Sequence, residues 1–136
     1  MIRVVILGSD ISALKCAHSI LDQNPLTEVK VYTEDAEVGF PEAPELDELV
    51  LEEVLPSIPS NWYSSIPLGI DQNTPSRVAG AWLSKAMAIH LTSRGGEFNL
   101  RTMILNIDEE QQEISFRGGG SDPFGVDKYD ELYDFR

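Results

Sequence analysis

The start of the chain places the strongest constraint on the fold, because an apolar run is followed at once by Gly8 and then by a helical pattern. Residues 2–7 are mostly apolar and β-branched, which is typical of a strand buried on both faces of a parallel sheet. Residues 11–22 carry apolar side chains at spacings of three, four and seven, and therefore predict a helix with one buried face. That face consists of Ala13, Cys16, Ala17 and Ile20. With a second strand predicted at 28–32, these elements form one right-handed strand–helix–strand unit with parallel strands.

A long irregular segment follows. Residues 34–76 hold most of the prolines of the chain, with one short acidic helix expected at about 46–55. Long excursions of this kind inside a small domain are usually functional or disordered. The large apolar side chains Trp62, Tyr63 and Ile66 favour a packed excursion here.

The last part of the chain predicts one more helix and several strands. A helix is expected at 77–93, with Ser76 as its N-cap and Gly95-Gly96 at its C-terminal end. Its predicted buried stripe consists of Val78, Ala81, Trp82, Ala86 and Ile89. Strands are expected at about 98–107, 113–116 and 128–135, and residues 118–120 are interpreted as a flexible loop. The length of 136 residues suits one domain with one core. We therefore predict a single α/β domain over residues 1–136, with a central parallel sheet, covering helices and an appended β-meander.

The charge balance limits the partners of the chain. Lysine and arginine total 10 against 23 aspartate and glutamate residues, which gives a formal net charge of −13. Such a surface repels nucleic acid and anionic membranes, and it opposes a free dinucleotide unless a local site overrides the general field. The single cysteine, Cys16, excludes an internal disulfide and fits a reducing compartment. The N-terminus has no signal-peptide pattern, and no apolar run reaches the ~20 residues of a membrane helix. We expect a cytoplasmic protein that binds neither nucleic acid nor membrane.

The turn after the first strand is the candidate functional site. In a dinucleotide-binding turn the first glycine makes the bend, the second admits the phosphate, and the third lets helix and strand pack closely. Gly8 stands at the first position and Ala13, an accepted substitute, at the third. Glu34, directly after the second predicted strand, stands where a carboxylate binds a ribose hydroxyl. The position of the central glycine is occupied by Asp10.

Asp10 leaves two interpretations open. A carboxylate at this point repels a phosphate, by roughly 4 kcal/mol at ~4 Å with an effective dielectric near 20. Aspartate is also a favoured N-cap, so Asp10 can itself neutralise the free N–H groups at the start of the helix. The alternative is a surviving phosphate site. In either case the candidate cofactor-binding residues are Gly8, Ser9, Asp10, Ile11, Ser12 and Glu34.

Several segments in order along the chain resemble FAD-dependent oxidoreductases, the group that includes aromatic hydroxylases, amine oxidases and lycopene cyclases. Residues 4–14 resemble their N-terminal fingerprint, and residues 33–39 are similar to their acidic residue followed by a glycine. Arg77 at the start of a helix, residues 95–98 and residues 129–132 resemble later segments, up to the Tyr-Asp strand that closes the family's FAD half-domain. The resemblance implies that the Gly8 turn binds the pyrophosphate of FAD and that Glu34 binds its adenosine ribose. The family's later Gly-Asp segment and substrate domain have no counterpart in this sequence.

Other reactive side chains give no site. His18 and His90 have no metal-ligand spacing beside them and are interpreted as partly exposed helix residues. Cys16 is interpreted as an inert core thiol, and Ser9 and Ser12 lack the flanking pattern of a hydrolase nucleophile. We predict no catalytic residue and no metal ligand.

Three functional hypotheses remain. The leading one is a FAD/NAD(P)-binding-like domain with lost or weakened dinucleotide affinity and no complete active site. The second is the FAD-binding part of an oxidoreductase that another chain completes. The third is an acidic protein-interaction module. FAD and no cofactor at all are equally compatible with the sequence, and the sequence leaves the oligomeric state open.

Overall fold

The computed structural model of the protein describes residues 2–36, 38, 58–63, 77–118 and 124–136, and of residues 77–82 only the backbone. The acidic helix predicted at 46–55, the side chain of Ile66, the Ser76 cap and the loop at 119–120 lie outside the described residues.

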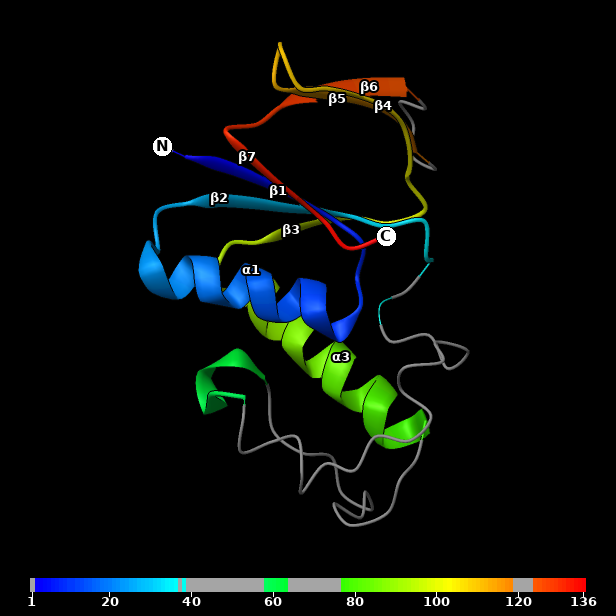
Figure 1. The fold of residues 1–136 in the computed structure, drawn as a ribbon. Coiled ribbons are helices and arrows are strands. Elements are labelled where there is room, and N and C mark those ends of the chain that lie inside the picture. Colours follow the sequence, from blue (N-terminus) through cyan, green and yellow to red (C-terminus); the bar gives the residue numbers. More distant parts are fainter. Residues whose placement is uncertain (1, 37, 39–57, 64–76, 119–123) are drawn as a thin grey trace.

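A four-stranded parallel sheet forms the centre of the molecule (Figure 1). Its strands are β1 (Arg3–Leu7), β2 (Glu28–Tyr32), β3 (Glu97–Asn99) and β7 (Glu131–Asp134). Their order across the sheet is β3-β2-β1-β7, and every neighbouring pair is parallel. β1 therefore lies inside the sheet, as its continuous apolar sequence predicts.

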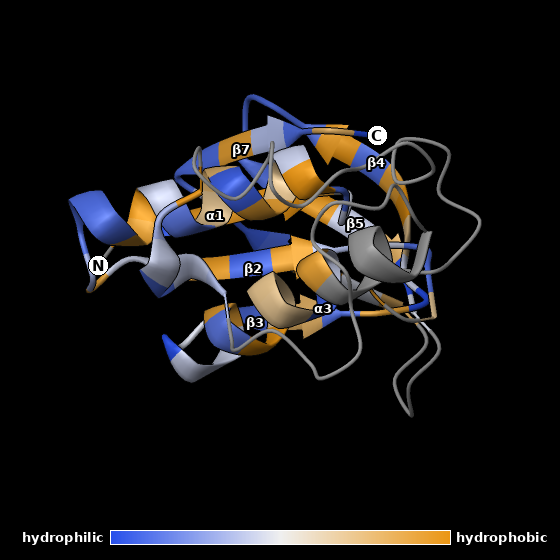
Figure 2. Cartoon of the chain, turned by 90° about the horizontal axis from the view of Figure 1, so that it is seen from below, coloured by the Kyte–Doolittle hydropathy of each residue, from blue (hydrophilic) through white to orange (hydrophobic). Residues whose placement is uncertain are grey.

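Two helices cover one face of this sheet. α1 (Ile11–Gln23) and α3 (Arg77–Ser93) lie side by side beneath the strands in Figure 1, and Figure 2 views the molecule from their side. The 3-10 helix η3 (Ser60–Trp62) packs against them, and Trp62 and Tyr63 contact the core as predicted. The buried apolar residues of this layer include Val4, Ile6, Ala13, Leu14, Ala17, Leu21, Val29, Val31, Leu83, Met87 and Leu91.

An antiparallel sheet covers the opposite face. Its strands are β4 (Met103–Asp108), β5 (Glu113–Arg117) and β6 (Phe124–Lys128), in the order β4-β5-β6. A second apolar cluster fills the space between the two sheets and contains Val5, Leu7, Tyr32, Ile114 and Tyr129. Successive side chains of β1 thus point alternately into the two cores. The predicted architecture is confirmed: helices, a parallel sheet and a β-meander form three layers.

Two predicted strands are each divided between the two sheets. The strand predicted at 98–107 is interrupted after β3, where Arg101 adopts a left-handed conformation with φ of 50°. Thr102 N then donates to Thr33 O at 2.8 Å, and from Met103 the chain continues in the antiparallel sheet. The strand predicted at 128–135 is interrupted at the buried Tyr129 and at Asp130, whose backbone N donates to Arg3 O at 2.8 Å. A continuous alternating pattern does not reveal such crossings, because the side-chain period is the same in both sheets.

The burial of α3 differs from the predicted stripe. Ala86 is buried as predicted, but Ile89 is 64% exposed. The other three stripe residues fall in the part of α3 whose side chains are not described. Leu83, Met87 and Leu91 form the buried face instead, because α3 packs against α1 as well as the sheet. The helix ends at Gly95-Gly96 as predicted, with Gly96 N bonded to Leu91 O at 2.9 Å.

His18 is fully buried, and its predicted partial exposure was wrong. It lies in the contact between α1 and α3, where Nε2 is 2.9 Å from Met87 O and Nδ1 is 2.9 Å from Nη1 of Arg94. Because arginine is always a donor, Nδ1 accepts and the neutral ring donates from Nε2. The rings of Trp62 and His90, which is itself half-buried, stack on it at 5.7 and 6.1 Å between centroids. Cys16 is half-buried against the core, and burial raises the pKa of its thiol, as expected for an inert thiol.

Candidate functional site

The Gly8 turn lies at the carboxyl edge of the parallel sheet, where it connects β1 to α1 (Figure 1). Gly8 has a φ of 109°, a conformation that side-chain-bearing residues rarely adopt. Its N donates to Tyr32 O at 2.8 Å, and on the other side Phe135 N donates to Leu7 O at 2.8 Å. A Cβ atom at Gly8 would lie 3.3 Å from backbone atoms of Phe135. The turn is therefore held tightly between the ends of β2 and β7.

Asp10 is the N-cap of α1. Its backbone is extended, with φ of −72° and ψ of 175°, and its Oδ1 accepts a hydrogen bond from Ala13 N at 2.7 Å. The main-chain oxygen of Asp10 also accepts from Leu14 N at 3.1 Å. One of the free N–H groups that a phosphate would bind is thus already satisfied by a carboxylate of the chain itself. The predicted capping role of Asp10 is present in the structure.

A small polar network joins the turn to the end of β2. The hydroxyl of Ser9 donates to Asp35 Oδ2 at 3.2 Å and lies 3.0 Å from Thr33 Oγ1. Thr33 Oγ1 in turn accepts from Asp35 N at 3.2 Å. Of these three residues only Ser9 was predicted as a site residue; Thr33 and Asp35 were not. Their position on either side of Glu34, at the end of a strand beside β1, was the signal that could have found them.

Glu34 lies where the sequence placed it, directly after the strand that neighbours β1, and its side chain is exposed. The nearby cation is Arg136. A hydrogen bond from Arg136 to Asp134 raises the pKa of the guanidinium, and the charge of Glu34 raises it further. Nη2 of Arg136 lies 2.9 Å from Asp134 Oδ2, and this bond lowers the pKa of that carboxyl. The end of β7 therefore brings a cation toward the carboxylate predicted to bind ribose.

The remaining predicted residues belong to the first turn of α1. Ile11 is half-buried against the core, whereas Ser12 is exposed. Together with Glu34, the structure thus gathers the predicted residues at one edge of the sheet, where α1 begins.

This edge carries more negative than positive charge. In the described part of the chain its charged side chains are four carboxylates and two arginines: Asp10, Glu34, Asp35, Asp134, Arg101 and Arg136. A pyrophosphate needs free N–H donors and net positive potential. The capped turn and the surrounding carboxylates do not fit that requirement.

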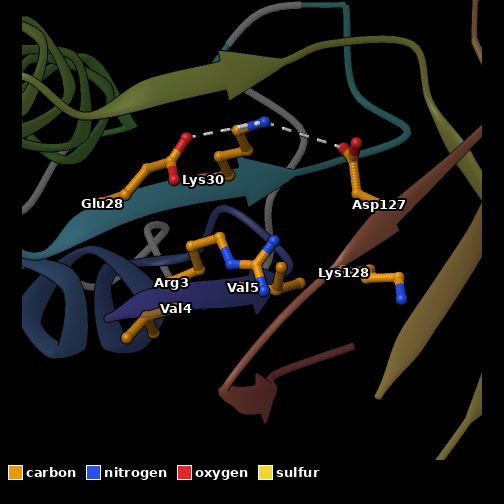
Figure 3. A pocket seen from close by; sticks show the side chains of 7 residues that line it. All are labelled: Arg3, Val4, Val5, Glu28, Lys30, Asp127 and Lys128. Carbon is orange, nitrogen blue, oxygen red and sulfur yellow. Dashed lines mark ion pairs between the residues drawn. The ribbon is translucent and has the colours of Figure 1, made fainter. Parts of the chain in front are cut away.

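A cavity of about 170 Å³ lies at the opposite, amino edge of the strands, between the two sheets (Figure 3). Arg3, Val4, Val5, Glu28, Lys30, Asp127 and Lys128 line it. Lys30 Nζ is 3.8 Å from Glu28 Oε1 and 4.0 Å from Asp127 Oδ2. Asp127 also accepts a hydrogen bond from the hydroxyl of Tyr32. These charged groups therefore pair with one another between the two sheets.

The described ranges contain no group of three or more histidine, cysteine, aspartate or glutamate side chains that could hold a metal ion. Among the same residues, no helix has the length and apolar character needed to cross a membrane.

A central parallel sheet with helices on one face, an antiparallel sheet on the other and a glycine turn after the first strand is the fold of the N-terminal Rossmann-type domain of FAD/NAD(P)-dependent oxidoreductases. The myxobacterial halogenase CndH, described as a FAD-dependent halogenase, superposes with a TM-score of 0.68 and 11% identity, over 98% of this chain and 36% of its own. The NADH-bound water-forming NADH oxidase from Lactobacillus brevis gives a TM-score of 0.60 and 18% identity, over 98% of this chain and 24% of its own. The NAD-dependent persulfide reductase from A. fulgidus gives a TM-score of 0.61 and 14% identity, over 98% of this chain and 20% of its own.

These similarities concern the fold. No protein-family model and no curated protein sequence matches the chain. The chain spans only 36%, 24% and 20% of the lengths of these three structures. The activities of those longer proteins therefore enter only as proposals.

Proposed function

We propose that this chain is a FAD/NAD(P)-binding-like domain whose dinucleotide affinity is lost or weakened, and that it works as a non-catalytic module. The observation that carries this proposal is the hydrogen bond from Ala13 N to Asp10 Oδ1, at 2.7 Å. The capping carboxylate takes the place that a phosphate oxygen would occupy at the start of α1.

The charges around the turn support the same conclusion. A phosphate about 4 Å from the Asp10 carboxylate is repelled by roughly 4 kcal/mol at an effective dielectric near 20. Asp35, held against Ser9, adds a second negative charge beside the turn. The field of a helix N-terminus amounts to about half a positive charge, so it does not compensate for two carboxylates.

A second candidate is the FAD-binding part of an oxidoreductase that another chain completes. The exposed position of Glu34 at the end of β2 favours it, because a carboxylate there can reach a ribose hydroxyl. In this hypothesis Gly8, Ser9, Ile11 and Ser12 supply the phosphate turn. The titration below separates the two candidates.

The test is a fluorescence titration of FAD, and separately of NADH, with the wild-type chain and two variants. Asp10→Gly removes both the carboxylate and the side chain, and we expect dinucleotide affinity to rise at least tenfold, which corresponds to about 1.4 kcal/mol. Asp10→Asn is the matched control, because it keeps a cap of similar shape and removes only the charge. A smaller gain in Asp10→Asn than in Asp10→Gly assigns the remainder to the bulk of the side chain.

Two results contradict the proposal. The first is wild-type protein that is purified yellow or binds FAD as tightly as Asp10→Gly. The second is identical titrations for all three proteins, which would show that Asp10 does not control the turn. Circular dichroism of each variant verifies that α1 is retained.

A further inference from the structure

The antiparallel sheet has an uncovered apolar face. In Figure 1 this sheet is the outermost layer, and no described element lies over its outer side. We call the outward side chains of β4, β5 and β6 the outer face. Its apolar members in the strand register are Met103, Phe124 and Val126, which are 40%, 63% and 61% exposed, and Leu105, at the irregularity of β4, is 50% exposed. These large apolar side chains stand on β4 and β6, on either side of the central strand β5. Exposed apolar groups of this kind mark interaction sites.

The strand register orders the outer face into rows. Met103, Arg117 and Phe124 stand beside one another at one end of the three strands. Asp108, Glu113 and Lys128 form the row at the other end. Ser115, beside Val126, lies between the two rows on the central strand. Each end row therefore has a charge on β5, positive at one end and negative at the other.

Arg117 is placed unusually. Its guanidinium has no ion-pair or hydrogen-bond partner among the described residues, and it stands between the apolar side chains of Met103 and Phe124. Glu113, four residues earlier on the same face, lies 3.5 Å from Lys128 Nζ. An arginine framed by apolar side chains is typical of protein interfaces, where a carboxylate of the partner completes it.

We infer that a second copy of this chain covers the outer face in a symmetric dimer. A two-fold axis that runs across the strands through the Ser115 row reverses the strand direction and places each strand opposite its own copy. Arg117 then lies opposite the partner's Glu113, and Val126 lies opposite the partner's Val126. Phe124 then lies opposite the partner's Lys128. The face of an aromatic ring attracts an ammonium group, so this contact is favourable. The two-fold axis therefore gives Arg117 of each copy a carboxylate partner in the other copy.

The size of the face and the net charge define the strength of this dimer. Three strands of five or six residues make a face of roughly 17 by 14 Å, which is small beside the roughly 800 Å² per partner of a standard interface. Two chains of net charge −13 also repel each other at long range. We therefore expect a weak, reversible dimer, and one that added salt strengthens, because salt screens the long-range repulsion more than the enclosed pairs.

Sedimentation velocity of the full chain tests the inference. From about 5 µM to about 500 µM we expect the weight-average mass to rise at least ~1.3-fold, with a larger rise in high salt. Val126→Asp should abolish the rise, since it places two carboxylates opposite each other at the axis. Ile89→Asp is the matched control, because Ile89 on α3 is 64% exposed and the change in charge is the same. A monomeric mass at all concentrations, or equal loss in both variants, overturns the inference.

A charge exchange tests the register of the two copies. Arg117→Glu should weaken the dimer at least about tenfold. The double variant Glu113→Arg/Arg117→Glu keeps the net charge of the wild type and exchanges the two members of each pair, so it should recover most of the loss. No recovery overturns the proposed axis. Thermal unfolding of each variant as a dilute monomer shows whether folding is retained.

Discussion

At the scale of single residues, Gly8 shows how the backbone controls the candidate site. Its φ of 109° disfavours any side chain, and a Cβ atom there would press on Phe135 at 3.3 Å. Gly95 at the end of α3 provides a comparison, because its φ of 96° is similar but nothing lies within 4 Å of the Cβ position. A side chain at Gly95 would therefore meet backbone strain alone, whereas a side chain at Gly8 would meet backbone strain and a steric contact.

We predict that Gly8→Ala lowers the free energy of unfolding more than Gly95→Ala does. Gly95→Ala should cost about 1 kcal/mol from backbone strain alone. Gly8→Ala should cost about 2–3 kcal/mol, because the turn must also move away from β7. Urea unfolding of both variants measures the difference. Equal losses would show that Phe135 gives way freely.

Residue identities predicted part of the candidate site. Asp10 could be recognised as an N-cap because capping is local and depends on the residue type and the next helical turn. The positions of Thr33 and Asp35 beside Glu34 were visible in the sequence, but their contacts with Ser9 were not, since these require β1 and β2 to be adjacent and in register. The burial of His18 depends on where α3 crosses α1, which no local pattern specifies.

At the scale of elements, His18 links α1 to α3 and to η3. Arg94 donates to Nδ1 of His18, and its Nη2 lies 2.6 Å from Asp22 Oδ1. Asp22 also accepts from Trp62 Nε1 at 2.7 Å, so η3 is bound to the same network. Burial lowers the pKa of His18, and the charges of Arg94 and His90 lower it further, while the bond to Met87 and the charge of Asp22 oppose them. Protonation would place an N–H of the ring against the guanidinium.

We predict that acid loosens this packing. In the folded chain His18 has a pKa below its ordinary value of 6.5, so protons bind the unfolded chain preferentially. The stability contributed by neutral His18 is therefore present above about pH 6.5 and is lost as the pH falls below it, by up to about 1.4 kcal/mol per pH unit. Urea unfolding between about pH 7 and pH 5.5 measures the slope. His18→Gln should flatten it and His90→Gln should not; the same slope in all three proteins would contradict the prediction.

The boundaries of the elements were predictable only where one element ends in a local signal. The strand at 28–32 and the end of α3 at Gly95-Gly96 agree with the prediction, because a turn at residues 24–27 precedes the strand and a glycine cap ends the helix. The division between β3 and β4 was not predictable, since it depends on the bond from Arg101 N to Asp35 O, far away in the sequence. The alternating pattern of a strand does not indicate which of two sheets the strand will join.

At the scale of the whole molecule, the excess of negative charge sets the response to salt. The net charge of −13 opposes compaction, and surface ion pairs such as Lys128–Glu113 contribute little to the free energy of unfolding. We predict that raising NaCl from about 20 to about 300 mM increases the stability of the dilute monomer by about 1 kcal/mol, and that the thermal midpoint rises by about 4 °C. Choline chloride should act equally, because screening does not depend on the cation. A falling midpoint would mean that the ion pairs outweigh the repulsion.

The pairing of β1 with β7 has a consequence for how the chain folds. Arg3 N donates to the side chain of Asp130, 127 residues later, so β1 completes its hydrogen bonding only when β7 is present. Contacts so distant in sequence slow folding, since a large loop must close before they form. During synthesis on a ribosome, β1 therefore keeps one edge unpaired until β7 has emerged. Protection by chaperones would matter most during that interval, well before any ligand could bind.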